Sequence, residues 1–152
     1  KDDTLSTDEN FTPEGELHWT FNRFEQKKQK ISKVIMAADG WNMPDLLVFC
    51  EIENRYAIDK LLIDTPLKKT PYKVIHKDSP DHRGIDVAMI YNSESFYPLD
   101  YKYYPLEYKE EEIATREILY VSGVVNETDT YIYSGITGLR GIQECLKRRN
   151  CE

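Results

Sequence analysis

The sequence predicts an α/β domain in which helices cover one face of a mixed sheet. The run Leu46–Cys50 is wholly apolar and ends in the acids Glu51 and Glu53, which is typical of a strand that is buried on both faces. A helix-periodic segment precedes this run, and several strand-like segments follow it. The order helix, strand, helix and then a succession of strands is typical of half of a layered sandwich.

The first elements are predicted to be a polar arm and a long helix. Residues 1–15 are polar and acidic, so we expect a loop or a poorly ordered segment. From Thr20, which can cap a helix, the apolar spacing becomes helical, and Asp39-Gly40 is expected to end it. The apolar face is expected to carry Phe21, Phe24, Ile31, Val34 and Ile35. The solvated side is expected to carry Lys27, Lys28 and Lys30, which we interpret as a soluble face and not as a nucleic-acid patch.

The second half of the chain is predicted to be mainly strands. Arg55–Ile63 indicates a short second helix, which Pro66 would end. Turn-rich and acidic stretches separate the segments that follow. The segments with strand character are Tyr72–His76, Ile85–Tyr91, Phe96–Tyr103 and Glu117–Val125.

Length and composition favour one compact domain. A chain of 152 residues with 40% hydrophobic content can bury one sizeable core. The net charge of −7 disfavours a dedicated nucleic-acid coat, because duplex binding needs clustered Lys and Arg, but it permits a metal-bridged phosphoester substrate. Cys50 is expected to act as a small apolar residue, and the three cysteines indicate no disulfide framework. No apolar run approaches membrane-spanning length, and a chain that opens on Lys1 does not indicate its compartment.

Glu51 is the first residue after the apolar run that could hold a metal ion. The alternative is a carboxylate that caps the next helix or faces water. Arg116 precedes a predicted strand and could clamp a phosphate through its bidentate fork. A surface salt bridge from Arg116 to Glu110–Glu112 is the alternative. His18 and His76 have no partners at ligand spacing, so we interpret both as ordinary polar residues.

Asp86 is expected to need a partner. It is the second residue of a predicted strand, and an unpaired carboxylate buried there would be strongly destabilising. Arg83 and His82 are the near candidates. Asp86 would then either form a structural ion pair that holds the turn or position phosphate-binding residues. Gly84 would permit a turn or a close backbone approach.

Three segments, in this order and spacing, resemble the bacterial endonuclease/exonuclease/phosphatase family. They are Pro44–Asn54, Arg83–Tyr91 and Thr115–Val121. This family includes pancreatic deoxyribonuclease and the exonuclease III-type repair endonucleases, and the resemblance runs from about Phe11 to Thr130. It implies a four-layer α/β sandwich, present here as an incomplete N-terminal half, and a phosphoesterase that depends on Mg²⁺ or Mn²⁺.

The resemblance also implies roles for individual residues. Glu51 would hold the divalent ion, which polarises the scissile phosphate and helps to activate water. Arg116 and Asp86 are the catalytic candidates. The side chains expected to orient the metal ligand or its waters are Glu53, Asn54 and Arg83. The family's first-strand asparagine is expected before Lys1, and its Asn-His, Asp-x-Asn and Asp-His segments do not follow Thr130.

Residues 131–152 are interpreted as an out-of-frame tail behind a partial family domain at residues 1–130. The family would continue with a strand resembling Leu-His-Ile-Phe-Val-Asn-His-Trp-Pro-Ser-Arg. A shift of the reading frame connects the two sequences. Some codons for Ile136–Gly141 encode His-Trp-Pro-Ser-Arg when they are read from the last base of the first codon. The same shift permits Leu-His-Ile-Phe from Thr130 to Ser134. The Val of the family strand is the one position that this shift does not recover. We infer a one-base frameshift near Thr130.

Two functions follow from this sequence. The first is a fragment of a magnesium-dependent phosphoesterase, a nuclease or phosphodiesterase, whose phosphoester substrate could be a nucleic acid. The alternative is a non-catalytic binding module or an inactive remnant, because the downstream acids and histidines are missing. This chain by itself is therefore expected to be inactive. Half of a sandwich would also leave sheet edges and an apolar face uncovered, so self-association is expected.

Overall fold

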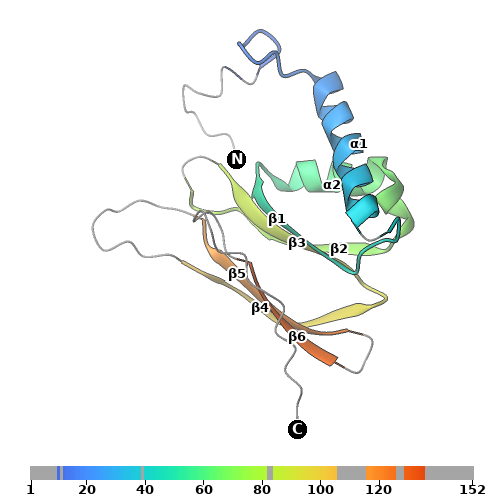
Figure 1. The fold of residues 1–152 in the computed structure, drawn as a ribbon. Helices are drawn as coiled ribbons and strands as arrows, with labels where there is room; N and C mark the ends of the chain where they lie inside the picture. The colour runs from blue at the N-terminus through green and yellow to red at the C-terminus, as the bar shows by residue number, and fades with distance from the viewer. Residues whose placement is uncertain are drawn as a thin grey trace.

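The computed structural model describes residues 10, 12–38, 40–81, 84–105, 116–125 and 129–135, the last range as backbone. The second helix and the four expected strands lie within one residue of their predicted bounds, whereas the last strand was not predicted. Figure 1 shows the elements, which are α1 (Phe21–Ala38), β1 (Leu46–Ile52), α2 (Arg55–Asp64), the 3-10 helix η2 (Pro66–Lys69), β2 (Tyr72–Lys77), β3 (Asp86–Asn92), β4 (Phe96–Tyr104), β5 (Ile118–Val125) and β6 (Asp129–Gly135).

Helix α1 begins as predicted and buries part of the predicted face. The Thr20 hydroxyl accepts a hydrogen bond from the Arg23 N–H at 3.3 Å, which caps the helix. Phe21 and Val34, expected on the apolar face, are 70% and 68% exposed. Ile35, expected on the same face, is buried against Leu61 and Leu67 as predicted, so the buried face is shifted and not wholly different. None of the helices in the described part of the chain is long and apolar enough to cross a bilayer.

Lys28 is buried, which corrects its predicted place on the solvated side of α1. Its side chain is 2% exposed, and its Nζ lies 2.5 Å from Glu25 Oε1 and 2.8 Å from Asp64 Oδ2. Burial alone would lower the pKa of Lys28, but the hydrogen bonds to Asp64 and Glu25 raise that pKa above its ordinary value. The ion pair to Asp64 therefore joins the middle of α1 to the end of α2.

Strand β1 is the edge of an antiparallel sheet with the order β1-β3-β2. The prediction that both faces of this strand are covered is wrong, because Val48 is 47% exposed and Cys50 is also exposed. Val48 pairs with Met89, so it shares the face of β3 that packs on the second sheet. The buried contacts of that second sheet lie over β2 and β3, and Leu46 of β1 packs against them, so among the described residues this face of β1 is open at Val48.

The described strands form two facing sheets. The second sheet has the order β4-β5-β6, and all pairings in both sheets are antiparallel. The core between the sheets consists of Ile75, Val87, Met89, Phe96, Leu119 and Val121. The helices cover the other face of the first sheet, where Ile58 packs with Ala88 and Ile90 (Figure 1). The α/β class and the covering helices are as predicted, but the strands divide between two antiparallel sheets.

The outward face of the β4-β5-β6 sheet carries exposed aromatic side chains. Tyr97 is 70% exposed and Tyr104 is 48% exposed. The Tyr104 ring meets that of Tyr120 edge-on, with centroids 6.3 Å apart. Val121 points into the core, so its neighbour Tyr120 points outward. No helix or strand among the described residues covers this face, so three layers of a sandwich are present in this part of the chain (Figure 1).

We expect the chain to self-associate through this face, because it exposes Tyr97 and Tyr104 and no helix or strand in the described part of the chain covers it. Replacing both Tyr97→Lys and Tyr104→Lys should lower the weight-average mass measured by sedimentation velocity at a fixed protein concentration. Val34→Lys, on the exposed side of α1, is the matched control and should leave the mass unchanged. An identical mass for both variants would contradict the assignment of the interface to this face.

Lys28→Met should lower the free energy of unfolding at pH 7 by about 1–3 kcal/mol, the range for hydrogen bonds to charged groups. The pKa of Asp64 is lowered by its hydrogen bond to Lys28. The stabilisation is therefore present above the ordinary Asp pKa of 3.8 and is lost as the pH falls through the lower folded-state value. Urea titrations across this range should show a shallower acid-side loss of stability in Lys28→Met than in Lys30→Met, the exposed control. If the free energy of unfolding falls equally with pH in Lys28→Met and Lys30→Met, the ion pair does not stabilise the fold.

Candidate functional site

Glu51 lies where β1 changes its register against β3. Cys50 pairs with Val87 and Ile52 pairs with Asp86, so Glu51 is the extra residue of a β-bulge. Its φ of 62° is in the left-handed region, which is uncommon for a residue with a side chain. Its side chain is 64% exposed. The bulge therefore directs a carboxylate into solvent at the carboxyl end of β1, as the sequence predicted for the strand end.

Arg116 connects the second sheet to this carboxylate. It lies two residues before β5 and its side chain is 2% exposed. Arg116 Nη1 is 3.0 Å from Glu51 Oε1, and Arg116 Nε is 3.9 Å from Asp81 Oδ2. Asp81 is fully buried in the segment between β2 and β3. The guanidinium thus lies between one exposed and one buried carboxylate. The predicted alternative partners, Glu110–Glu112, lie outside the described residues.

The exposed carboxylate of Glu51 suits a further cation. An exposed carboxylate oxygen is a ligand of the type that Mg²⁺ prefers, and Mg²⁺ usually retains several waters, for which the exposure of Glu51 leaves room. Burial raises the pKa of the adjacent Cys50 thiol, and the nearby Arg116 charge opposes that rise. Cys50 is therefore protonated at neutral pH and unsuited to act as a nucleophile.

Asp86 is buried and paired, as predicted, but its partner is a different residue. Asp86 Oδ2 is 2.9 Å from His76 Nε2, and Asp86 Oδ1 accepts the backbone N–H of Ser79 at 2.8 Å. His76 was interpreted as an ordinary polar residue, and this is wrong, because its side chain is 5% exposed in the pair. The predicted partners His82 and Arg83 lie outside the described residues. The β2–β3 register, which places His76 opposite Ala88, explains the pairing.

The turn between β2 and β3 links Asp86 to the Arg116 site. The Ser79 hydroxyl donates to the Ile85 carbonyl at 2.8 Å and accepts from the Asp81 N–H at 3.2 Å. Gly84, with φ of 65°, donates its N–H to the Asp81 carbonyl at 3.0 Å. The left-handed conformation explains a glycine at this position. Asp86 pairs with Ile52, the residue that follows Glu51, and its hydrogen bond from Ser79 holds the turn that contains Asp81.

The residues beside Glu51 have different surroundings. The Asn54 side chain accepts the Ala57 N–H at 3.0 Å and caps α2, so its observed role is structural. Glu53 is exposed between β1 and α2. Arg83 lies outside the described residues. Of the three side chains expected to orient the metal ligand, Glu53 and Asn54 thus lie in the segment that follows Glu51. The residue that approaches Glu51 from a distant segment is Arg116, before β5.

The described residues also contain one group with the spacing of metal ligands. His76, Asp78 and Asp86 each offer a ligand atom, and these atoms lie within 4.8 Å of one another. Sequence analysis missed this group because His76 and Asp78 are close in the chain but Asp86 joins them only through the strand pairing. The sequence does contain a pattern that could have indicated this group. It is a His-x-Asp at the end of one strand, followed by an Asp at the start of the next strand.

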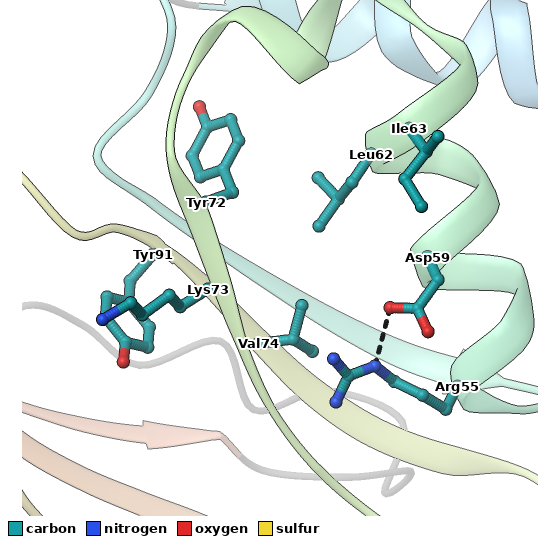
Figure 2. A pocket seen from close by; sticks show the side chains of 8 residues that line it. All are labelled: Arg55, Asp59, Leu62, Ile63, Tyr72, Lys73, Val74 and Tyr91. Atoms are coloured by element: carbon teal, nitrogen blue, oxygen red, sulfur yellow. Dashed lines mark hydrogen bonds and ion pairs between the residues drawn. The ribbon is translucent and has the colours of Figure 1, made fainter.

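A separate groove with a volume of about 470 Å³ lies between α2 and β2. Figure 2 shows the side chains that line it. Arg55 Nε and Asp59 Oδ1 pair with each other at 2.8 Å in its wall. Burial raises the pKa of Tyr72 to about 12, so its hydroxyl stays protonated and donates to the Pro44 carbonyl at 2.6 Å. Because these groups are already paired, the groove is a weaker candidate than the end of β1. The full lining is Arg55, Asp59, Leu62, Ile63, Tyr72, Lys73, Val74 and Tyr91.

Comparisons with known proteins identify a family and a related fold. A sequence model described as the endonuclease/exonuclease/phosphatase family matches residues 1–135, which extends past the boundary expected at Thr130. Among solved structures, the human Nocturnin catalytic domain with bound sulfate anion is similar, with a TM-score of 0.54 and 15% sequence identity. The similarity covers 72% of this chain and 41% of that domain. No curated protein matches the chain.

Asp86→Ala should lower the free energy of unfolding by about 2–4 kcal/mol, because it leaves the buried His76 ring and the Ser79 N–H without their acceptor. Equilibrium urea unfolding would measure this. Asp100→Ala is the matched control, since Asp100 makes an exposed ion pair with Lys102 at 3.2 Å, and it should change stability by less than about 0.5 kcal/mol. Equal effects of the two substitutions would show that the Asp86 network is not structural.

Proposed function

Because the chain belongs to the endonuclease/exonuclease/phosphatase family, we propose that it is part of a Mg²⁺-dependent phosphoesterase in which Glu51 binds the metal ion. The observation that carries this proposal is the exposed Glu51 carboxylate, which a β-bulge presents at 3.0 Å from the guanidinium of Arg116. A carboxylate beside a fixed cation is the combination that metal-assisted phosphoryl transfer needs at one site. Mn²⁺ would suit the same oxygen ligands.

The chemistry at this site divides between the metal ion and Arg116. A bound divalent ion would polarise a phosphoryl oxygen and lower the pKa of a coordinated water. Arg116 would hold a phosphate oxygen through its planar fork and neutralise charge that develops on the phosphate. The bound sulfate of the Nocturnin domain is a tetrahedral oxyanion of similar shape, which supports an anion subsite in this fold. Asp86 would keep Arg116 in place through the turn that carries Asp81.

A nuclease or phosphodiesterase activity is the finer part of the proposal. The fold is compatible with several phosphoester substrates, so it does not choose among them. The net charge of −7 favours a substrate recognised through the metal ion and Arg116 over one that is bound by an extended basic surface. A bacterial source for this chain and a nucleic-acid substrate both stay predictions from the sequence resemblance.

A second candidate function is a non-catalytic remnant of the family. The observation that favours it is that residues 131–152 do not match the strand Leu-His-Ile-Phe-Val-Asn-His-Trp-Pro-Ser-Arg with which the family would continue. We propose that the 152-residue chain alone is inactive and that a protein whose reading frame is restored after residue 130 is active. Sequencing of the locus would test the frameshift.

The activity test compares both proteins on bis(p-nitrophenyl) phosphate, with Mg²⁺ and with EDTA. We expect no turnover above the buffer rate for the 152-residue chain. The restored protein should show Mg²⁺-dependent turnover, and Glu51→Gln should lower it at least about 100-fold, because a neutral amide is a poor metal ligand. Glu94→Gln, an exposed acid in the β3–β4 turn, is the matched control.

Two outcomes would overturn parts of this proposal. Robust turnover by the 152-residue chain that Glu51→Gln abolishes would refute the inactive-remnant hypothesis and support the metal site. Turnover by the restored protein that is equal in Glu51→Gln and Glu94→Gln would remove Glu51 from the mechanism.

A further inference from the structure

We propose that His76, Asp78 and Asp86 form a second metal site, which binds a zinc-type divalent ion and is separate from Glu51. The three residues come from adjacent strand ends. His76 is in β2 and Asp78 is two residues later, so both side chains project to the same side of an extended chain. Lys77 pairs with Val87, so an antiparallel register continued by one residue places Asp86 opposite Asp78.

The geometry of the three ligand atoms is close to that of a metal site. They lie within 4.8 Å of one another, and the Asp86–His76 pair is already at 2.9 Å. Ligand atoms at about 2.1 Å from a tetrahedral Zn²⁺ are separated by about 3.4 Å. A small rearrangement would therefore form the site: the His76 and Asp86 ligand atoms would separate by about 0.5 Å, and the exposed Asp78 side chain would move toward them. The fourth position would face solvent beside Asp78.

Burial makes two of the three ligands rigid. The side chains of His76 and Asp86 are 5% and 4% exposed. The Ser79 N–H donates to the second Asp86 oxygen at 2.8 Å, which fixes the orientation of the carboxylate. A hydrogen bond of this kind to a ligating carboxylate is typical of metal sites. Asp78 is exposed, so an ion could enter from solvent without unfolding the pair.

The ligand types favour zinc over magnesium. One imidazole with two carboxylates is a mixed nitrogen and oxygen set, which suits Zn²⁺, whereas Mg²⁺ prefers an octahedron of oxygens and waters. Two carboxylates that face the same point also favour a cation between them. Binding would replace the hydrogen bond between His76 and Asp86 and release its proton. The ion would then join β2 to β3 at the turn that holds Asp81.

Isothermal titration of the 152-residue chain with ZnCl₂ tests this site without any measurement of activity. We expect one Zn²⁺ per chain with a Kd in the micromolar range or tighter, and a higher Tm with Zn²⁺ than with EDTA. Asp78→Asn should weaken binding at least tenfold and abolish the increase in Tm. Because Asp78 is exposed, this variant should fold and retain the His76–Asp86 pair. Glu94→Gln should bind Zn²⁺ like the original chain.

Cysteine thiolates can also bind zinc, so Co²⁺ provides the second measurement. Binding at His76, Asp78 and Asp86 should give visible d–d bands without the near-ultraviolet thiolate band, and Asp78→Asn should remove them. Equal Zn²⁺ affinity of Asp78→Asn and Glu94→Gln, an intense thiolate band, or no binding above the buffer blank would each overturn the proposal. Loss of binding in Glu51→Gln but not in Asp78→Asn would assign the zinc to the Glu51 site instead.

Discussion

The buried guanidinium of Arg116 holds the candidate site together. It belongs to the segment before β5, yet it contacts Glu51 at the end of β1 and lies near Asp81 in the turn before β3. A buried cation without these carboxylates would be strongly destabilising, so its burial requires the three segments to stay together. The position of Glu51 therefore depends on the packing of one sheet on the other.

The backbone at Glu51 reflects the same constraint. A left-handed conformation costs an L-residue roughly 1–2 kcal/mol, and such conformations are common at sites where function requires a particular side-chain direction. The bulge turns the carboxylate away from the ladder of β1 and β3 and toward Arg116. A regular strand would have directed residue 51 to one face of the sheet, as it does for its neighbours.

Family membership and catalytic competence are separate properties of this chain. The helices and two sheets form three layers of a sandwich, and the aromatic outward face of the second sheet has no cover among the described residues. The chain spans 41% of the Nocturnin catalytic domain. A metal-assisted phosphoester reaction needs a bound ion, an oriented water and stabilisation of the developing charge. Among the described residues, Glu51 is the candidate for binding the ion and Arg116 is the candidate for stabilising the charge.

Many local features could be predicted from the sequence. The bounds of α2 and of four strands, the Thr20 cap, the carboxylate at the end of β1 and the need of Asp86 for a partner all follow from local periodicity and polarity. These properties depend on neighbours in the chain, which the sequence displays directly.

The features that only the tertiary structure decided involve partners that are distant in sequence. Lys28 is buried because Asp64 meets it from another helix, and His76 pairs with Asp86 because of a strand register. Val48 is exposed because the buried contacts of the second sheet lie over β2 and β3 and, in the described part of the chain, reach β1 at Leu46 but not at Val48. Whether a side chain is buried, and which charge lies beside it, depends on how the elements pack, and periodicity along one segment carries no information about that packing.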